Sequence, residues 1–98
     1  MPLREFSETI QQDLRDPEFA LEYLQSGWEA DQATFLVSLR DIIQARGGMS
    51  QLAEATGLSR ESLYKTLSPT GNPQLATIQK ILCTLGYDFI PIRRAVLA

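Results

Sequence analysis

The sequence predicts an all-α protein of five to six helices, with extra helices at the N-terminus and room for one short strand near the C-terminus. Apolar residues recur every three or four positions through most of the 98 residues, which is the period of an amphipathic helix. Between these segments stand glycines and capping residues, the usual ends and starts of helices. At this length the chain forms one domain at most.

Two helices are predicted in the N-terminal third. Four apolar residues set the period of the first helix: Leu3, Phe6, Ile10 and Leu14. Asp16 and Pro17 predict the start of the second helix, because aspartate caps free backbone amides and proline fits the first helical turn. The stripe of the second helix contains Phe19, Tyr23, Leu24 and Trp28. Gly27 predicts that this helix frays near its end.

A third helix is predicted between Asp31, which would cap it, and Gly47–Gly48, which would end it. Its wide apolar face contains Phe35, Leu36, Leu39, Ile42 and Ile43. Arg40 and Arg46 lie off that face.

The segment between Ser50 and Leu67 predicts two short helices that cross steeply. Ser50 is expected to cap the first, and Ser59 the second. Ala53 supplies the small residue where the helices meet, and Gly57 tolerates the positive φ of the turn. Three leucines are expected to point inward and fix the angle: Leu52, Leu58 and Leu63. This order of residues is that of a helix-turn-helix.

Asn72–Pro73 predicts the start of the last helix, which Gly86 stops. Its apolar positions are Leu75, Ile78, Ile81, Leu82 and Leu85. Cys83 is expected on the apolar side as a buried thiol. The following segment, residues 87–92, forms either a short strand able to pair with a second copy or a coil. Pro91 would confine such a strand to an edge.

Composition argues against an enzyme. The chain has no histidine and one cysteine, which removes the commonest general base and any zinc site. No glycine-rich phosphate loop or nucleophile motif occurs, so no cofactor and no small-molecule substrate are expected. We also expect no membrane helix and no signal peptide, because the necessary apolar runs are missing. With a single cysteine, this favours a cytoplasmic protein.

Charge divides the chain into two parts. Residues 1–35 carry a net charge of −6 and residues 36–98 a net charge of +3, within a total of −3. This asymmetry favours two surfaces with different partners, one cationic and one anionic. The alternative is that the acidic residues only solvate the outer faces of the N-terminal helices.

The second helix of the predicted helix-turn-helix carries side chains suited to DNA. Arg60 can donate two hydrogen bonds to guanine, and Ser62 can donate or accept. Glu61 can accept from cytosine or orient Arg60. Lys65 is expected to contact phosphate, and so to set affinity rather than sequence choice. The competing interpretation is a helical hairpin with a solvated charged face.

The run from Gly57 to Ser68, with Gly71–Asn72–Pro73 after it, resembles the HigA-type addiction-module antidote proteins. The helix-turn-helix itself is similar to that of the phage-repressor (Cro/CI-like) group. Upstream matches extend the similarity to residues 6–85: Pro17–Glu18, Tyr23–Leu24, Asp31, Phe35, Leu39–Ile42 and Ala45–Gly47. The sequence departs from the usual pattern of this family at two places. Gly47–Gly48 is one glycine longer than the usual connection, and Thr66 replaces an apolar residue.

The resemblance implies an antitoxin that neutralises a small basic RelE-like ribonuclease toxin. It also implies a homodimer that represses its own operon on palindromic double-stranded operator DNA. The major-groove residues would be Arg60, Glu61, Ser62 and Lys65. Residues near phosphates would be Ser50, Gln51, Ser59, Tyr64, Thr70, Asn72 and Arg46.

The two parts of the chain receive different expected roles. Residues 1–30 would form an acidic extension for partner binding or dimerisation, and residues 31–98 the DNA-binding domain. Apolar anchors toward the toxin would be Phe6, Ile10 and Trp28, whereas Phe19 and Tyr23 are expected in the core. Two alternatives stay open: a DNA-binding regulator without a toxin, and an interaction module that has lost DNA binding.

Overall fold

The computed structural model describes residues 3–68, 70 and 72–95, with side chains described from residue 8 onward. Within these residues the protein is all-helical and contains no strand, which confirms the predicted fold class. The helices are α1 (Leu3–Asp13), α2 (Pro17–Ala30), α3 (Gln32–Ala45), α4 (Gly48–Thr56), α5 (Arg60–Thr66) and α6 (Leu75–Leu85).

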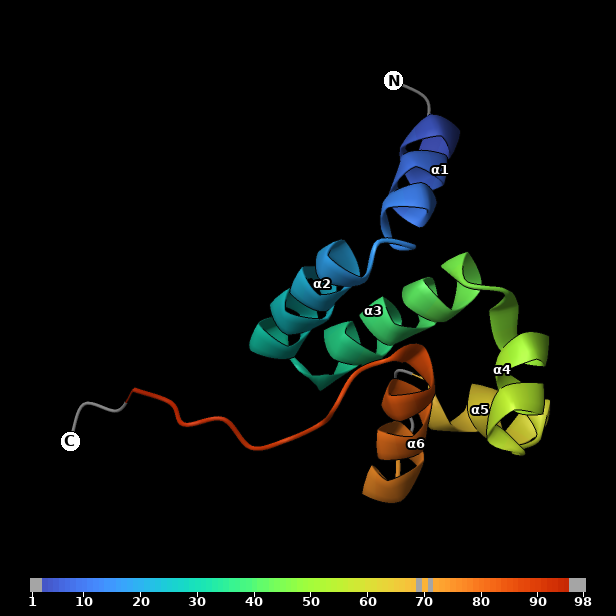
Figure 1. The fold of residues 1–98 in the computed structure, drawn as a ribbon, viewed down its shortest axis with the longest axis vertical. Coiled ribbons are helices and arrows are strands. Elements are labelled where there is room, and N and C mark those ends of the chain that lie inside the picture. Colours follow the sequence, from blue (N-terminus) through green and yellow to red (C-terminus); the bar gives the residue numbers. More distant parts are fainter. Residues whose placement is uncertain (1–2, 69, 71, 96–98) are drawn as a thin grey trace.

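The helices surround α3, which is the centre of the fold (Figure 1). The most extensive pairing is that of α2 with α3, and α3 also contacts α1 and α4. At the C-terminal end of α3, α4 packs against both α5 and α6. In Figure 1, α1 projects away from the body, and the chain after α6 runs back toward α2 and then away from it. The helix-turn-helix therefore rests on one end of α3, while α2 lies along its length.

Three of the predicted helix starts are confirmed. An Asp16 carboxylate oxygen accepts from the Glu18 N–H at 3.0 Å, and Asp31 accepts from the Thr34 N–H at 2.7 Å. At the start of α5, the Ser59 hydroxyl accepts from the Ser62 N–H at 3.0 Å. Each side chain satisfies a backbone donor that has no partner within the helix.

Two other predicted starts were wrong. Ser50 lies inside α4, because the left-handed Gly47 (φ 111°) turns the chain so that the helix begins at Gly48 without a side-chain cap. Asn72–Pro73 lies ahead of α6, whose N-cap is Gln74 in an extended conformation. Neither helix has a side-chain cap hydrogen bond, so the capping pattern in the sequence placed these starts incorrectly.

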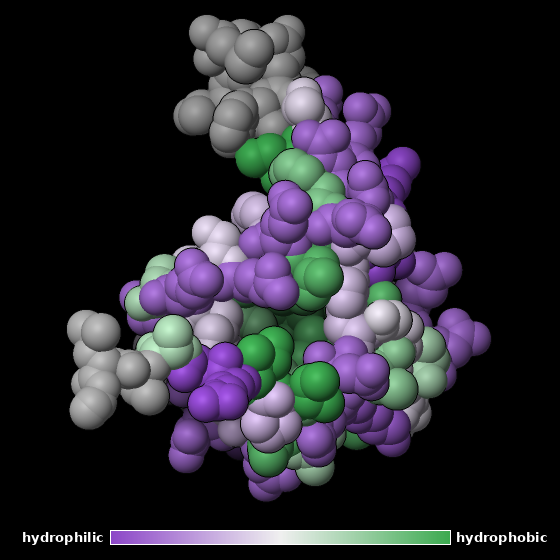
Figure 2. Space-filling view, turned by 60° about the vertical axis from the view of Figure 1, so that its left-hand side comes forward, coloured by the Kyte–Doolittle hydropathy of each residue, from purple (hydrophilic) through white to green (hydrophobic). Residues whose placement is uncertain are grey.

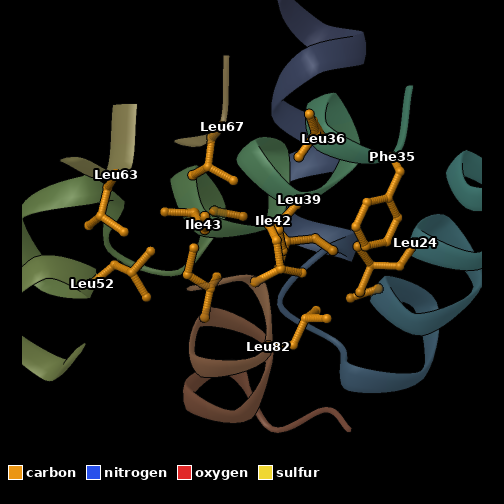
Figure 3. Close-up of a cluster of buried hydrophobic side chains, with 14 of the residues drawn as sticks. Leu24, Phe35, Leu36, Leu39, Ile42, Ile43, Leu52, Leu63, Leu67 and Leu82 are labelled. Atoms are coloured by element: carbon orange, nitrogen blue, oxygen red, sulfur yellow. The ribbon is translucent and has the colours of Figure 1, made fainter. Parts of the chain in front are cut away.

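One buried cluster joins both parts of the chain (Figure 3). Leu14, Ala20 and Leu24 come from the N-terminal part, and Leu63, Leu67 and Ile81 come from the helix-turn-helix and α6. Between them lie the buried residues of α3: Phe35, Leu36, Ser38, Leu39, Ile42, Ile43 and Ala45. Each fully buried leucine or isoleucine contributes about 1.5–3 kcal/mol of hydrophobic stabilisation. Residues 1–30 and residues 31–98 therefore contribute to one continuous core.

Gly27 does not fray α2, contrary to the prediction. The helix continues to Ala30, and Gly27 is buried against α3. A Cβ atom at this position would lie 2.5 Å from the Ser38 hydroxyl oxygen and 3.2 Å from the Phe35 Cα atom. Glycine is thus required by the close approach of the two helices.

The end of the chain differs from expectation in the position of its cysteine. Cys83 is exposed, because α6 buries Ile78, Ile81 and Leu82 and Cys83 lies beyond that face. Residues 87–95 form a coil, which was one of the two alternatives predicted for this segment. Phe89 pins this coil to the body through ring contacts with Trp28, at 5.6 Å between centroids, and Phe35, at 6.2 Å.

Candidate nucleic-acid interface

The turn between α4 and α5 is fixed by backbone conformation and by a threonine. Gly57 adopts φ 75°, and its N–H donates to the Ala53 carbonyl at 2.9 Å. Thr56 is buried; its hydroxyl donates to the Leu52 carbonyl at 2.8 Å and accepts from the Leu58 N–H at 3.2 Å. The glycine was predicted, but the threonine was not. Thr56 ties the end of α4 to the first residue after the turn, and so restricts the angle between the helices.

One face of α5 is anchored in the core and the other is exposed. Leu63 and Leu67 are completely buried, as is most of Leu52 on α4, and Leu58 packs partly against the same cluster. This confirms that the three predicted leucines point inward. Thr66 at the end of α5 is half-buried, and the other polar residues of this helix lie on the surface: Arg60, Glu61, Ser62, Tyr64 and Lys65. A short helix held this rigidly can present its exposed face to a groove.

Most residues predicted near phosphates lie on the surface around this helix. Ser50 and Gln51 are exposed on α4, and Thr70 and Asn72 are exposed in the loop after α5. The Thr70 and Ser68 hydroxyls lie 3.2 Å apart, within hydrogen-bonding distance. Tyr64 is 48% exposed. Ser59 is exposed too, although its hydroxyl is already used as the cap of α5.

Arg46 is placed differently from the rest of this set. Its guanidinium donates to the carbonyls of Leu14, at 3.3 Å, and Leu85, at 2.8 Å. It also donates to the Tyr87 hydroxyl at 2.7 Å and lies over the Tyr87 ring, 5.4 Å from its centroid. All three guanidinium nitrogens donate within the protein, so the phosphate contact predicted for Arg46 would have to use the two remaining N–H groups. Nothing in the local sequence around Arg46 predicts these distant partners.

The predicted partner residues are not equally placed. The side chain of Phe6 lies outside the described residues, and Ile10 is half-buried against the core. Trp28 is 53% exposed and packs edge-on against Phe35, with ring centroids 5.3 Å apart. Phe19 was expected in the core but is 37% exposed, since α2 buries Ala20, Leu24 and Gly27 instead.

Tyr23 joins α2 to α3 rather than filling the core alone. It is half-buried, and its hydroxyl donates to an Asp41 carboxylate oxygen at 2.7 Å. Burial raises the pKa of Tyr23 to about 12, with further contributions from the hydrogen bond to Asp41 and from the charge of that carboxylate. The phenol is therefore held in its neutral form.

The surface of the molecule is mixed in character. Figure 2 shows a largely hydrophilic face on which hydrophobic residues gather in patches near the middle. The large exposed apolar residues are Phe19, Leu21, Trp28, Val37, Tyr64, Leu75, Ile90 and Ile92. Among the described residues, no cluster of histidine, cysteine or acidic side chains is arranged to hold a metal ion. No helix in that part of the chain is both long and apolar enough to span a bilayer.

Comparison with known proteins identifies the family. Residues 3–92 match the family described as "Probable addiction module antidote protein". The chain belongs to this family. The chain is also similar to an uncharacterized protein of Haemophilus influenzae, 46% identical over 68 residues that cover 68% of this chain and 69% of that protein. No solved structure matches it. Membership supports the role of an antitoxin with a toxin partner, which was the role predicted from the sequence.

Proposed function

We propose that this antidote protein binds double-stranded operator DNA through α4 and α5 and represses its own operon as a homodimer. The observation that carries the proposal is the division of α5. Its apolar face, formed by Leu63 and Leu67, is completely buried, whereas five of its polar residues are exposed to solvent. A helix packed in this way needs no rearrangement to enter a major groove about 12 Å wide.

The proposed base contacts come from the exposed face of α5. Arg60 and Ser62 supply donors, Glu61 supplies an acceptor, and Lys65 supplies a positive charge toward bases or phosphate. The surrounding phosphate contacts come from Ser50, Gln51, Ser59, Tyr64, Thr70 and Asn72. A homodimer would place its two recognition helices about 34–36 Å apart, one turn of the DNA, which fits a palindromic operator.

The toxin is proposed to dock on the N-terminal part, residues 1–30. Residues 1–35 carry a net charge of −6, which complements a small basic ribonuclease of the RelE-like kind. Trp28, half-exposed at the end of α2, is the aromatic anchor best placed for such a contact. Phe6 and Ile10 on α1 complete the proposed anchor set.

The DNA-binding proposal is tested by a gel-shift titration against the DNA upstream of the protein's own gene, with unrelated competitor present. Arg60→Ala should cost about 1–3 kcal/mol of binding free energy and relax the preference for the operator, because a base contact is lost. Lys65→Ala is the control on the same helix. If Lys65 contacts phosphate, this change should weaken binding to all sequences equally.

Two outcomes would contradict the proposal. A wild-type protein that does not bind its upstream DNA at micromolar concentration would rule out autonomous operator binding. A specific shift that Arg60→Ala leaves unchanged would show that α5 does not read the bases.

A further inference from the structure

A groove beside the proposed recognition helix, α5, is lined mainly by residues from outside the helix-turn-helix. It lies between α3 and α5. Its lining residues are Val37, Arg40, Asp41, Gln44, Met49 and Tyr64. The first four of these residues belong to α3, Met49 lies in the first turn of α4, and Tyr64 belongs to α5. The groove therefore connects the surface of α5 with that of α3.

Arg40 is the basic side chain among the residues that line this groove. It is exposed, and no hydrogen bond or ion pair engages its guanidinium anywhere in the described part of the chain. Two other arginines differ: Arg46 donates three hydrogen bonds within the protein, and Arg15 donates to the Ala45 carbonyl at 3.2 Å. Among the described residues no ion pair joins Arg40 to the neighbouring Asp41, whose carboxylate accepts a hydrogen bond from the Tyr23 hydroxyl.

The helical geometry places Arg40 at the flank of the recognition surface. Successive residues of an α-helix are rotated by about 100°, so Tyr64 lies to one side of the buried Leu63, whereas Lys65 lies opposite the core. If the face around Lys65 points into the major groove, the Tyr64 side faces one wall of that groove, which is a phosphate backbone. Gln44 lies one turn after Arg40 on α3 and is also exposed.

We infer that Arg40 and Gln44 form a phosphate-binding site for one DNA strand at the edge of the major groove, adjoining Tyr64. The inference rests on the proposed DNA binding by α5. Guanidinium binds phosphate through two parallel hydrogen bonds, and the Gln44 amide adds a neutral donor. Contacts of this kind fix the register of a protein on the duplex and carry no sequence information. The site would thus orient α5 from outside the helix-turn-helix.

The experiment is a salt titration of DNA binding by Arg40→Ala, using the operator and an unrelated duplex. One phosphate contact contributes about 0.9 to the slope of log K against log salt, so its loss costs roughly eightfold at 0.1 M salt. We expect this loss on both duplexes, with the slope reduced by about 0.9. Gln44→Ala should weaken binding without changing the slope, since it removes no charge.

Arg94→Ala is the matched control, because it removes the same charge from the exposed coil after α6. An equal loss in Arg40→Ala and Arg94→Ala would attribute the effect to net charge and overturn the inference. An Arg40→Ala protein whose slope of log K against log salt is unchanged would overturn it too. This includes a variant that forms a weaker dimer, in which case the groove would be a contact between proteins. If wild-type protein binds neither duplex, the proposed function fails instead, so the two failures are distinct.

Discussion

At the residue scale, the contact between α2 and α3 depends on a position without a side chain. Gly27 lies in the last turn of α2, inside a helix that continues to Ala30, and glycine costs up to about 1 kcal/mol relative to alanine in a helix. The structure explains this cost, because the Ser38 hydroxyl and the Phe35 backbone occupy the space that a methyl group would need. A sequence pattern shows only a helix-weakening residue, and so predicts fraying where there is close packing.

Gly27→Ala should therefore destabilise the protein, although alanine is the better helix former. A methyl group forced into this contact costs about 1–3 kcal/mol, which exceeds the gain in helix propensity. Urea unfolding measures the difference. Gly27→Ala combined with Ser38→Ala should recover part of the loss, because the hydroxyl oxygen at 2.5 Å is removed. A single variant more stable than wild type would disprove the close approach.

At the element scale, α2 and α3 are joined by a polar contact as well as by the core. The Tyr23 hydroxyl donates to Asp41, and the pKa of Tyr23 is raised to about 12. The folded state therefore favours the neutral phenol more than the unfolded chain does, whose tyrosine pKa is about 10. The stabilisation by this group is complete below pH 10 and is lost as the pH rises through about 12.

Tyr23→Phe should make this dependence visible. The wild type should exceed the variant in free energy of unfolding at pH 7–9, and the difference should shrink between pH 10 and 12. Urea unfolding at a series of pH values measures it, with Tyr64→Phe as a control for removing a phenol from the surface. A difference that stays constant up to pH 12 would show that the Tyr23 phenol is not protected by folding.

At the scale of the whole molecule, Arg46 connects segments that are far apart in the chain. It binds the carbonyls of Leu14, after α1, and Leu85, at the end of α6. It also binds Tyr87, whose own hydroxyl donates to the Pro17 carbonyl at 2.9 Å. Arginine suits this position, because its charge compensates the negative ends of helices and its five N–H donors reach several acceptors.

Arg46→Ala should lower the free energy of unfolding by more than about 2 kcal/mol, because buried carbonyls lose their donors. Arg40→Ala, within the helix that Arg46 caps, is the matched control and should change stability by less than about 0.5 kcal/mol. The two substitutions are thus expected to have different effects: Arg46→Ala should lower stability, and Arg40→Ala should lower DNA affinity. If Arg46→Ala were as stable as the control but bound DNA less well, Arg46 would be a phosphate contact after all.

The helices, the glycine turn at Gly57 and the exposed face of α5 could all be predicted from the sequence. These features depend on periodicity, capping and φ angles within a few residues, and such local causes can be read along the chain. The packing of distant segments was needed to show that Arg46 donates within the protein, that Gly27 is a packing contact and that Arg40 makes no hydrogen bond beside α5. Two arginines six positions apart look alike in sequence. What separates them is the position of carbonyls from α1 and α6, which residues distant in the chain bring to Arg46 and not to Arg40.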